Sequence, residues 1–228
     1  MARTSKNRLR VIRGAAWLAL VAPLAWLALR VLHDHLGANP IEAIILWSGV
    51  STLVLLMLTL AVTPLRRLTG WNEVVRVRRF LGLTAFGYLC LHFLSYVGLD
   101  QFFAFDFILA DIAKRPFITV GFAAFLLLIP LAVTSTKGWI RRLGRRWQRL
   151  HQLVYVATAL GVLHYYWKVK ADTRWPLVFA IVLVVLLAAR VRARRSAEKR
   201  RSTPGATPVV EHAAAPADAD LRRTPVEA

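Results

Sequence analysis

Long apolar runs alternate with short, basic connections over most of the chain. Each apolar run approaches the roughly 20 residues that an α-helix needs to cross the hydrocarbon core of a bilayer. Backbone groups in a bilayer must bond within their own segment unless a barrel closes, and the period-two alternation of barrel strands does not occur here. The pattern predicts an all-α integral membrane protein, a six-transmembrane helix bundle, with spans near 14–32, 41–63, 80–98, 117–134, 150–168 and 176–190.

Lysine and arginine are concentrated in every second connection. The N-terminal arm, the 64–79 and 135–149 connections and the tail from Arg190 hold 25 of the 31 basic residues. By the positive-inside rule, both termini and these connections are expected in the cytoplasm. We therefore expect a cytoplasmic basic arm at 1–13, the bundle at 14–190, and a disordered cytoplasmic tail at 191–228 that contacts anionic membrane lipid.

Composition agrees with a membrane protein and excludes several other classes. Hydrophobic residues make up 57% of the chain, although the formal net charge is +19. The basic residues lie between apolar runs and not on one amphipathic surface, so no nucleic-acid partner is expected. The single cysteine, Cys90, excludes an intrachain disulfide, a cysteine-ligated iron–sulfur or zinc site, and covalent c-type haem attachment.

The stretch WIRRLGRRWQRL, residues 139–150, places its Trp and Leu residues at spacings of three and four, with Arg on the other faces. This spacing predicts one interfacial helix on the inner leaflet. Its role is left open between membrane anchoring and a docking surface for a cytoplasmic donor or a flavin phosphate.

Three histidines lie within predicted spans: His92 in the third, and His151 and His164 in the fifth. No Asp, Glu, Lys or Arg lies mid-membrane, whereas pumps and ion-coupled transporters generally need such charges. Neutral imidazoles without acidic neighbours suit haem iron, which takes the unprotonated nitrogen. One such histidine would be expected only to hydrogen-bond between helices. Three, on two helices, favour iron ligation.

The depth of each histidine indicates how the three are grouped. The third and fifth spans run in the same direction, and His92 lies about 13 residues beyond the basic residues that begin its span. His164 lies about 20 Å beyond His151 on an ideal helix. His92 and His164 are therefore expected to share the outer half of the bilayer as a bis-histidine site, with His151 as a half-site at the inner level. Lys114 and Arg115, at the outer face, are candidates to pair with haem propionates, or else to snorkel.

Four strings carry a resemblance to a known family: YLCLHFLSY (88–96), KRPFITVGF (114–122), LIPLAVTS (128–135) and WQRLHQLVYVATALGVLHYYW (147–167). Over roughly residues 10–190 the chain resembles the MsrQ (YedZ) family. Members of that family are haem-binding membrane subunits of a bacterial protein-methionine-sulfoxide reductase system. They are related to the ferric reductase-like transmembrane domain.

The resemblance implies six spans in the bacterial inner membrane, haem b in one copy or two, and an associated FMN. It also implies electron transfer from the quinone pool, or from a cytoplasmic flavin reductase, to a periplasmic molybdopterin enzyme that reduces methionine sulfoxide. The catalytic site is then expected on that partner. By motif, His92, His151 and His164 match the family's haem-associated histidines. Phe117 stands where Tyr is expected in KRP-x-IT, which weakens any role for a hydroxyl there.

Two other functions remain open from the sequence. One is a free-standing cytochrome b-type ferric or quinone reductase. The chain has no G-x-G-x-x-G motif and no soluble domain for a dinucleotide, so its electrons must come from a quinol or a separate protein. The other is a transporter or structural membrane protein without haem, against which the missing mid-membrane charges and the three histidines argue.

Overall fold

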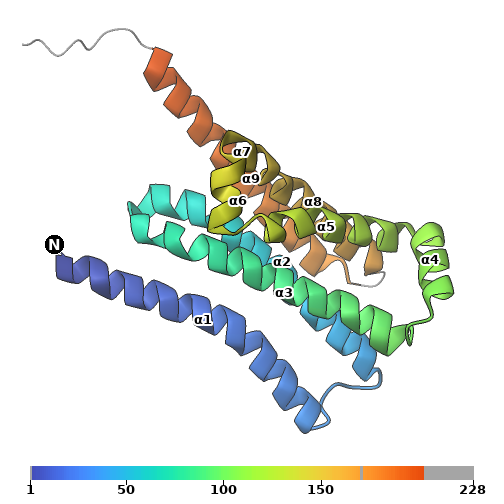
Figure 1. Cartoon of the computed structure of the whole chain (residues 1–228). Helices are drawn as coiled ribbons and strands as arrows, with labels where there is room; N and C mark the ends of the chain where they lie inside the picture. The colour runs from blue at the N-terminus through green and yellow to red at the C-terminus, as the bar shows by residue number, and fades with distance from the viewer. Residues whose placement is uncertain (1, 170–171, 203–228) are drawn as a thin grey trace, which may run out of the picture. The chain divides into compact units, whose positions relative to one another are not determined.

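The computed structural model describes residues 2–169 and 172–202, which form helices and turns and contain no strand (Figure 1). The described part of the chain divides into two units between Arg192 and Ala193, and the helices of the first unit build the bundle. The long helices are α1 (Ala2–Leu32), α2 (Pro40–Thr69), α3 (Arg78–Ser95), α5 (Pro116–Val133), α8 (Leu153–Lys168) and α9 (Arg174–Ser202). The shorter elements are η1 (Asn72–Val77), η2 (Tyr96–Asp100), α4 (Phe105–Lys114), α6 (Lys137–Leu143) and α7 (Arg145–Leu150).

Five of the described helical segments are long and apolar enough to cross a membrane: 7–32, 40–69, 72–100, 116–133 and 174–193. The all-helical architecture agrees with the prediction. The remaining predicted span, 150–168, corresponds to α8, which has 16 residues and is not among the five. Its shortness follows from the turn at His151 and Gln152, which separates α8 from α7.

The ends of α2 follow from the local sequence. Pro40 occupies the first turn, where its missing N–H is not needed, and the Asn39 side chain accepts a hydrogen bond from the Glu42 backbone N–H. The helix ends at Gly70, whose φ of 70° is in the left-handed region that glycine adopts without strain. With these two ends, α2 is longer than the predicted span 41–63.

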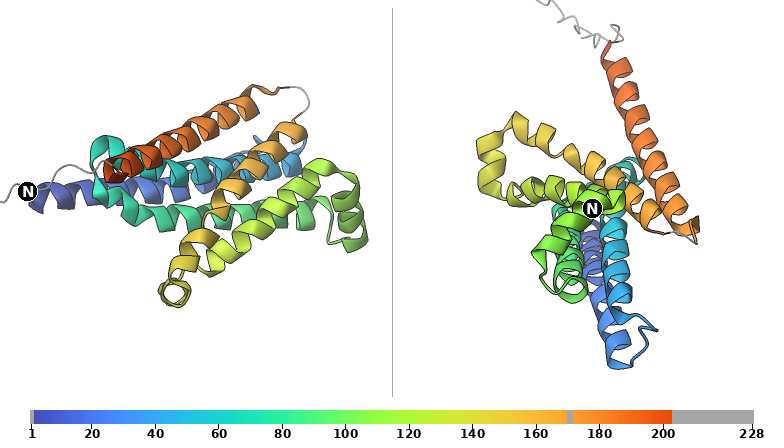
Figure 2. Two further views of the ribbon diagram at one scale, coloured as in Figure 1. Left: turned by 90° about the horizontal axis from the view of Figure 1, so that it is seen from above. Right: turned by 90° about the vertical axis from the view of Figure 1, so that its right-hand side faces the viewer.

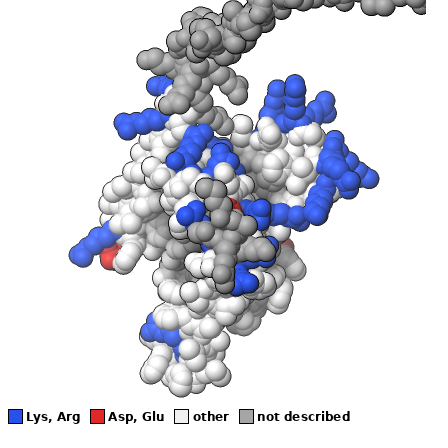
Figure 3. All heavy atoms as spheres, turned by 90° about the vertical axis from the view of Figure 1, so that its left-hand side faces the viewer, with Lys and Arg blue, Asp and Glu red and all other residues white. Residues whose placement is uncertain are grey.

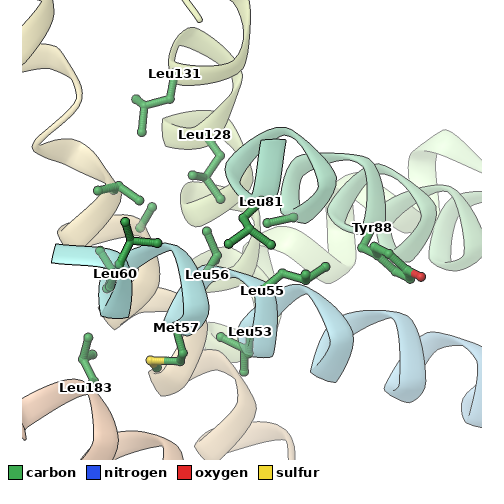
Figure 4. Packing of buried hydrophobic residues seen from close by; sticks show 14 of the residues in the cluster. Leu53, Leu55, Leu56, Met57, Leu60, Leu81, Tyr88, Leu128, Leu131 and Leu183 are labelled. Carbon is green, nitrogen blue, oxygen red and sulfur yellow. The ribbon is translucent and has the colours of Figure 1, made fainter. Parts of the chain in front are cut away.

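The hydrophobic core is built around α2, the most buried of the five candidate spans. Figure 4 shows its side chains between the neighbouring helices. The buried residues labelled there come from α2 (Leu53, Leu55, Leu56, Met57, Leu60), α3 (Leu81, Tyr88), α5 (Leu128, Leu131) and α9 (Leu183), and α8 adds Val154, Ala157 and Val162. The most exposed candidate span is α1, which is tied to the bundle by hydrogen bonds from Tyr88 to the Leu20 carbonyl oxygen and from Trp47 to the Pro23 carbonyl oxygen.

The bundle contains two tightly packed antiparallel pairs, α2 with α3 and α5 with α8. The η1 and α6–α7 connections lie at one end, and α4 lies at the other (Figure 1). Figure 3 looks at the first end, where lysine and arginine side chains far outnumber acidic ones. The alternation of basic and less basic connections along the sequence thus corresponds to two ends of the bundle.

The predicted interfacial helix at 139–150 is two helices, α6 and α7, which project beside the ends of α5 and α8 (Figure 2). The break falls at Gly144, whose φ of 49° and ψ of −120° are incompatible with continuing helix. Both predicted boundaries of the bundle, at residues 13 and 190, fall inside helices, because α1 begins at Ala2 and α9 continues to Ser202. The rest of the predicted tail, 203–228, lies outside the described residues.

Candidate functional site

His92 lies on α3 and its ring faces α2. Its Nδ1 is 2.8 Å from the carbonyl oxygen of Ile45. A carbonyl only accepts hydrogen bonds, so Nδ1 must carry the proton. Nε2 of the neutral ring then presents a lone pair, and it takes part in none of the hydrogen bonds among the described residues. This is the tautomer that an imidazole adopts when it binds a metal through Nε2.

His164, on α8, has the same arrangement relative to α5. Its Nδ1 is 2.6 Å from the carbonyl oxygen of Phe117, so Nδ1 is the protonated nitrogen and Nε2 carries the lone pair. The Phe117 ring also packs against the His164 ring, with 6.0 Å between the two ring centres. Each helix pair therefore holds one imidazole in a fixed tautomer and orientation.

The structure brings these two histidines together. The centres of the His92 and His164 rings are 6.1 Å apart, and the ring planes cross at 83°. Two imidazoles that bind one metal from opposite sides, each through a bond of about 2 Å, have ring centres roughly 6 Å apart. The separation of the pair therefore fits two axial ligands of one metal.

A glycine on the facing helix makes room for each ring. A Cβ on Gly49 would lie 3.0 Å from Nδ1 of His92, and a Cβ on Gly121 would lie 2.6 Å from Nδ1 of His164. Real Cβ atoms do not approach other atoms as closely as 2.6 Å. Gly121 therefore permits the observed position of His164, and Gly49 does the same less strictly for His92.

The same set of acceptor carbonyl, glycine and histidine occurs twice along the chain. The acceptor and the histidine are 47 residues apart in both helix pairs. A shift of 72 residues carries Ile45, Gly49 and His92 onto Phe117, Gly121 and His164. We did not predict the two acceptors and the two glycines from the sequence. The spacing common to both halves is the signal that could have identified them.

His151 follows the last turn of α7 and lies apart from the pair. Its ring stacks on Trp147 with centres 3.9 Å apart, and its Nδ1 is 3.2 Å from the Trp147 carbonyl oxygen. Its Nε2 is buried and has no hydrogen-bond partner among the described residues. A buried polar atom without a partner is costly, which makes this nitrogen a candidate metal ligand, and the Leu131 backbone also interacts with the ring.

The basic residues predicted near the pair have different surroundings. Lys114 ends α4 and is exposed. The Arg115 side chain lies 3.3 Å from the carboxylate of Asp111, which also accepts a hydrogen bond from the Tyr96 hydroxyl. Phe117 contributes its carbonyl oxygen to His164, a role that does not depend on the hydroxyl that a tyrosine would add.

The donor set of the pair fits a metal that brings other ligands with it. No group of three or more His, Cys, Asp or Glu side chains that could hold an ion occurs among the described residues. Two imidazoles alone would leave a bare ion with open positions, whereas a porphyrin supplies four equatorial nitrogens to iron. The residues present therefore fit haem.

Comparison with known proteins places the chain in a family. Residues 46–162 match the family described as "Ferric reductase like transmembrane component". The matched region contains α3, α5 and most of α2 and α8. It includes His92, Gly49, Phe117 and Gly121, and it ends just short of Ile45 on one side and of His164 on the other. Fold and site thus define the class: an integral, multi-pass membrane protein of the ferric reductase-like type.

Curated relatives identify the family within that class. The chain is 53% identical over 190 residues to "Protein-methionine-sulfoxide reductase heme-binding subunit MsrQ" of Herminiimonas arsenicoxydans, covering 82% of this chain and 87% of the relative. Its counterpart in Rhodospirillum rubrum is 55% identical over 84% of this chain and 94% of the relative. The Caulobacter vibrioides counterpart is 51% identical over 86% and 95%. The chain belongs to the MsrQ family.

Proposed function

We propose that this protein is the haem-binding membrane subunit of a protein-methionine-sulfoxide reductase system and conducts electrons across the bacterial inner membrane. The observation that carries the proposal is the His92–His164 pair, with both Nδ1 atoms bonded to carbonyl oxygens and ring centres 6.1 Å apart. The relatives, which are named as heme-binding subunits of this reductase, support the same function.

In this proposal His92 and His164 would hold haem b through their Nε2 atoms, and Ile45 and Phe117 fix the orientation of their rings through the Nδ1 hydrogen bonds. Bound haem supplies reversible one-electron chemistry. Lys114 and Arg115 are proposed to hold haem propionates, for which Arg115 would have to share its guanidinium with Asp111. His151 is proposed as the ligand of a second haem, supported by its buried Nε2 without a partner among the described residues.

Electrons are proposed to come from a quinol or from a cytoplasmic flavin reductase, with FMN as an associated cofactor. They would pass to a periplasmic, molybdopterin-containing subunit that carries the catalytic site for methionine sulfoxide. Six spans, with both termini in the cytoplasm, place the basic end of the bundle on the donor side. The distribution of 25 of 31 basic residues over the N-terminal arm, the tail and two connections supports this orientation.

The first test is the reduced-minus-oxidised visible spectrum of the purified full-length protein, with haem quantified per chain. We expect a haem b spectrum of the bis-histidine type. His92→Ala and His164→Ala should each lose the same signal, because each removes one axial ligand. His33→Ala, an exposed histidine outside the site, is the matched control and should keep the full signal. Protein from haem-sufficient cells that shows no haem band would refute the proposal.

His151→Ala separates one haem from two. If His151 holds a second haem, the variant loses part of the haem per chain and keeps the spectrum of the His92–His164 centre. Equal loss in all three histidine variants would contradict the separation of His151 from the pair.

A free-standing ferric reductase is the second candidate, favoured by the name of the matched family model. The two functions differ in their electron acceptor. Dithionite-reduced protein should be reoxidised by a periplasmic methionine sulfoxide reductase only in the presence of a methionine sulfoxide substrate. Reoxidation by chelated ferric iron, and not by the reductase, would favour the second candidate.

A further inference from the structure

A second polar site lies at the opposite end of α3 from His92. It is a pocket of about 210 Å³ lined by Val62, Thr63, Arg66, Val75, Arg78 and Arg190. Arg78 begins α3, so on an ideal helix the pocket lies about 21 Å from the level of His92. The pocket therefore does not belong to the histidine pair.

Three arginines from three separate helices line this pocket: Arg66 from α2, Arg78 from α3 and Arg190 from α9. None of its lining residues is acidic. Arg66 and Arg78 form no salt bridge with any carboxylate among the described residues, and Arg190 lies 3.5 Å from the Thr63 hydroxyl. Like charges repel, so three arginines around one pocket without an acidic lining residue favour a bound anion.

A buried hydroxyl lies close to the pocket. The Arg190 guanidinium lies over the Tyr155 ring, 4.8 Å from its centre, and the Tyr155 hydroxyl is buried without a hydrogen-bond partner among the described residues. A buried hydroxyl of this kind beside a pocket favours a polar ligand bound nearby.

We propose that the Arg66–Arg78–Arg190 pocket binds a phosphate group. One guanidinium is enough to neutralise a carboxylate through a bidentate contact. Three arginines and the Thr63 hydroxyl match a group that has several acceptor oxygens and a charge of about −1 to −2, as phosphate diesters and monoesters have. The site is separate from the His92–His164 pair. A phosphomonoester there rests on the proposed association with FMN, whereas a lipid phosphate there goes beyond the proposed function.

A phosphate at this position has two possible sources. A soluble phosphomonoester, for which FMN is the probe, would insert its terminal phosphate from the aqueous side. An anionic phospholipid would place its head group there from the leaflet around the basic end of the bundle. Both use the same three arginines, and the experiment distinguishes them.

The test compares two double variants of the full-length protein in phosphatidylcholine nanodiscs. Arg66→Gln/Arg78→Gln removes two pocket arginines. Arg67→Gln/Arg79→Gln, the matched control, removes two exposed arginines at the adjacent positions of the same helices. FMN binding is followed by quenching of flavin fluorescence. Retention of phosphatidylglycerol is followed by native mass spectrometry of the detergent-purified protein.

We expect saturable binding of one of the two probes to weaken at least about tenfold in the pocket variant and to stay unchanged in the control, because charge-assisted hydrogen bonds are lost. Loss of FMN binding identifies a phosphomonoester site, and loss of phosphatidylglycerol retention identifies a lipid site. Equal behaviour of the two variants toward both probes overturns the proposal. A preserved haem spectrum in the pocket variant shows that the bundle is folded, and Arg78→Lys is used instead if that spectrum is lost.

Discussion

At the residue scale, the function of each histidine depends on which of its two nitrogens is bonded to the backbone. The sequence identified His92, His151 and His164 as candidates because they are imidazoles within apolar runs that have no Asp, Glu, Lys or Arg in their middle. It did not identify Ile45 or Phe117, because any residue can offer a carbonyl oxygen. Within the helices those oxygens already accept backbone hydrogen bonds, and only the packing of one helix on its neighbour shows that they also accept from an imidazole.

Gly121→Ala tests the close approach of α5 to His164. The added Cβ would lie 2.6 Å from Nδ1, so the ring must move and its hydrogen bond to Phe117 must break. We expect lower haem content and a melting temperature reduced by several degrees, since overpacking typically costs about 1–3 kcal/mol. Gly49→Ala, where the contact would be 3.0 Å, should have a smaller effect.

Gly87→Ala is the control for this prediction, because Gly87 lies in helix α3 and a Cβ there would meet nothing within 4 Å. It should keep its haem and be as stable as the parent protein or more stable by up to about 1 kcal/mol. Haem content that is equal in the Gly121 and Gly87 variants would show that the fit around His164 does not matter.

At the element scale, the sequence predicted helices well where hydrophobic runs are long, and less well where one glycine redirects the chain. The Trp and Leu spacing of 139–150 fits one continuous helix, yet α6 ends at Leu143 and α7 begins at Arg145. Gly144 lacks a Cβ and so adopts a backbone conformation closed to other residues. A hydrophobic pattern contains no information about such a break. It also did not reveal that α8 begins only after His151.

Gly144→Ala should destabilise the corner between α6 and α7. A Cβ at φ of 49° and ψ of −120° is strained, at a cost of about 1–3 kcal/mol, although a Cβ there would meet no atom within 4 Å. The expected result is faster proteolysis within 137–150 and a lower melting temperature. Gly138→Ala, in α6 and equally open to space, should be neutral. Equal protease sensitivity of the two variants would mean that the corner is not strained by the Cβ.

At the scale of the whole molecule, two helix pairs repeat one arrangement, and the candidate metal site lies where they meet. The pairs α2–α3 and α5–α8 each supply one histidine, one carbonyl acceptor and one glycine at the same relative positions. Two equivalent ligands from two equivalent halves are suited to a symmetric group such as a porphyrin iron, which takes one axial ligand on each face.

Cysteine labelling tests whether α8 crosses the membrane. In a Cys90→Ser background, Gly138→Cys at the basic end and Asp172→Cys beyond α8 both introduce an exposed thiol. With six spans, a membrane-impermeant maleimide should label Gly138→Cys only in inside-out vesicles and Asp172→Cys only in right-side-out vesicles. Asp106→Cys, near the start of α4, should label like Asp172→Cys. Labelling of the Gly138 and Asp172 positions from the same side would show that α8 does not span.

The sequence by itself determined that this is a helical membrane protein with a basic end and three candidate ligand histidines. These properties follow from the length of apolar runs, from the placement of charge and from the rarity of ionisable residues in a bilayer, all of which are local. Only the tertiary structure decided that His92 and His164 meet at 6.1 Å, that Gly49 and Gly121 permit it, and that Arg66, Arg78 and Arg190 share one pocket. Each of these depends on contacts between residues far apart in the chain, which hydrophobic periodicity does not specify.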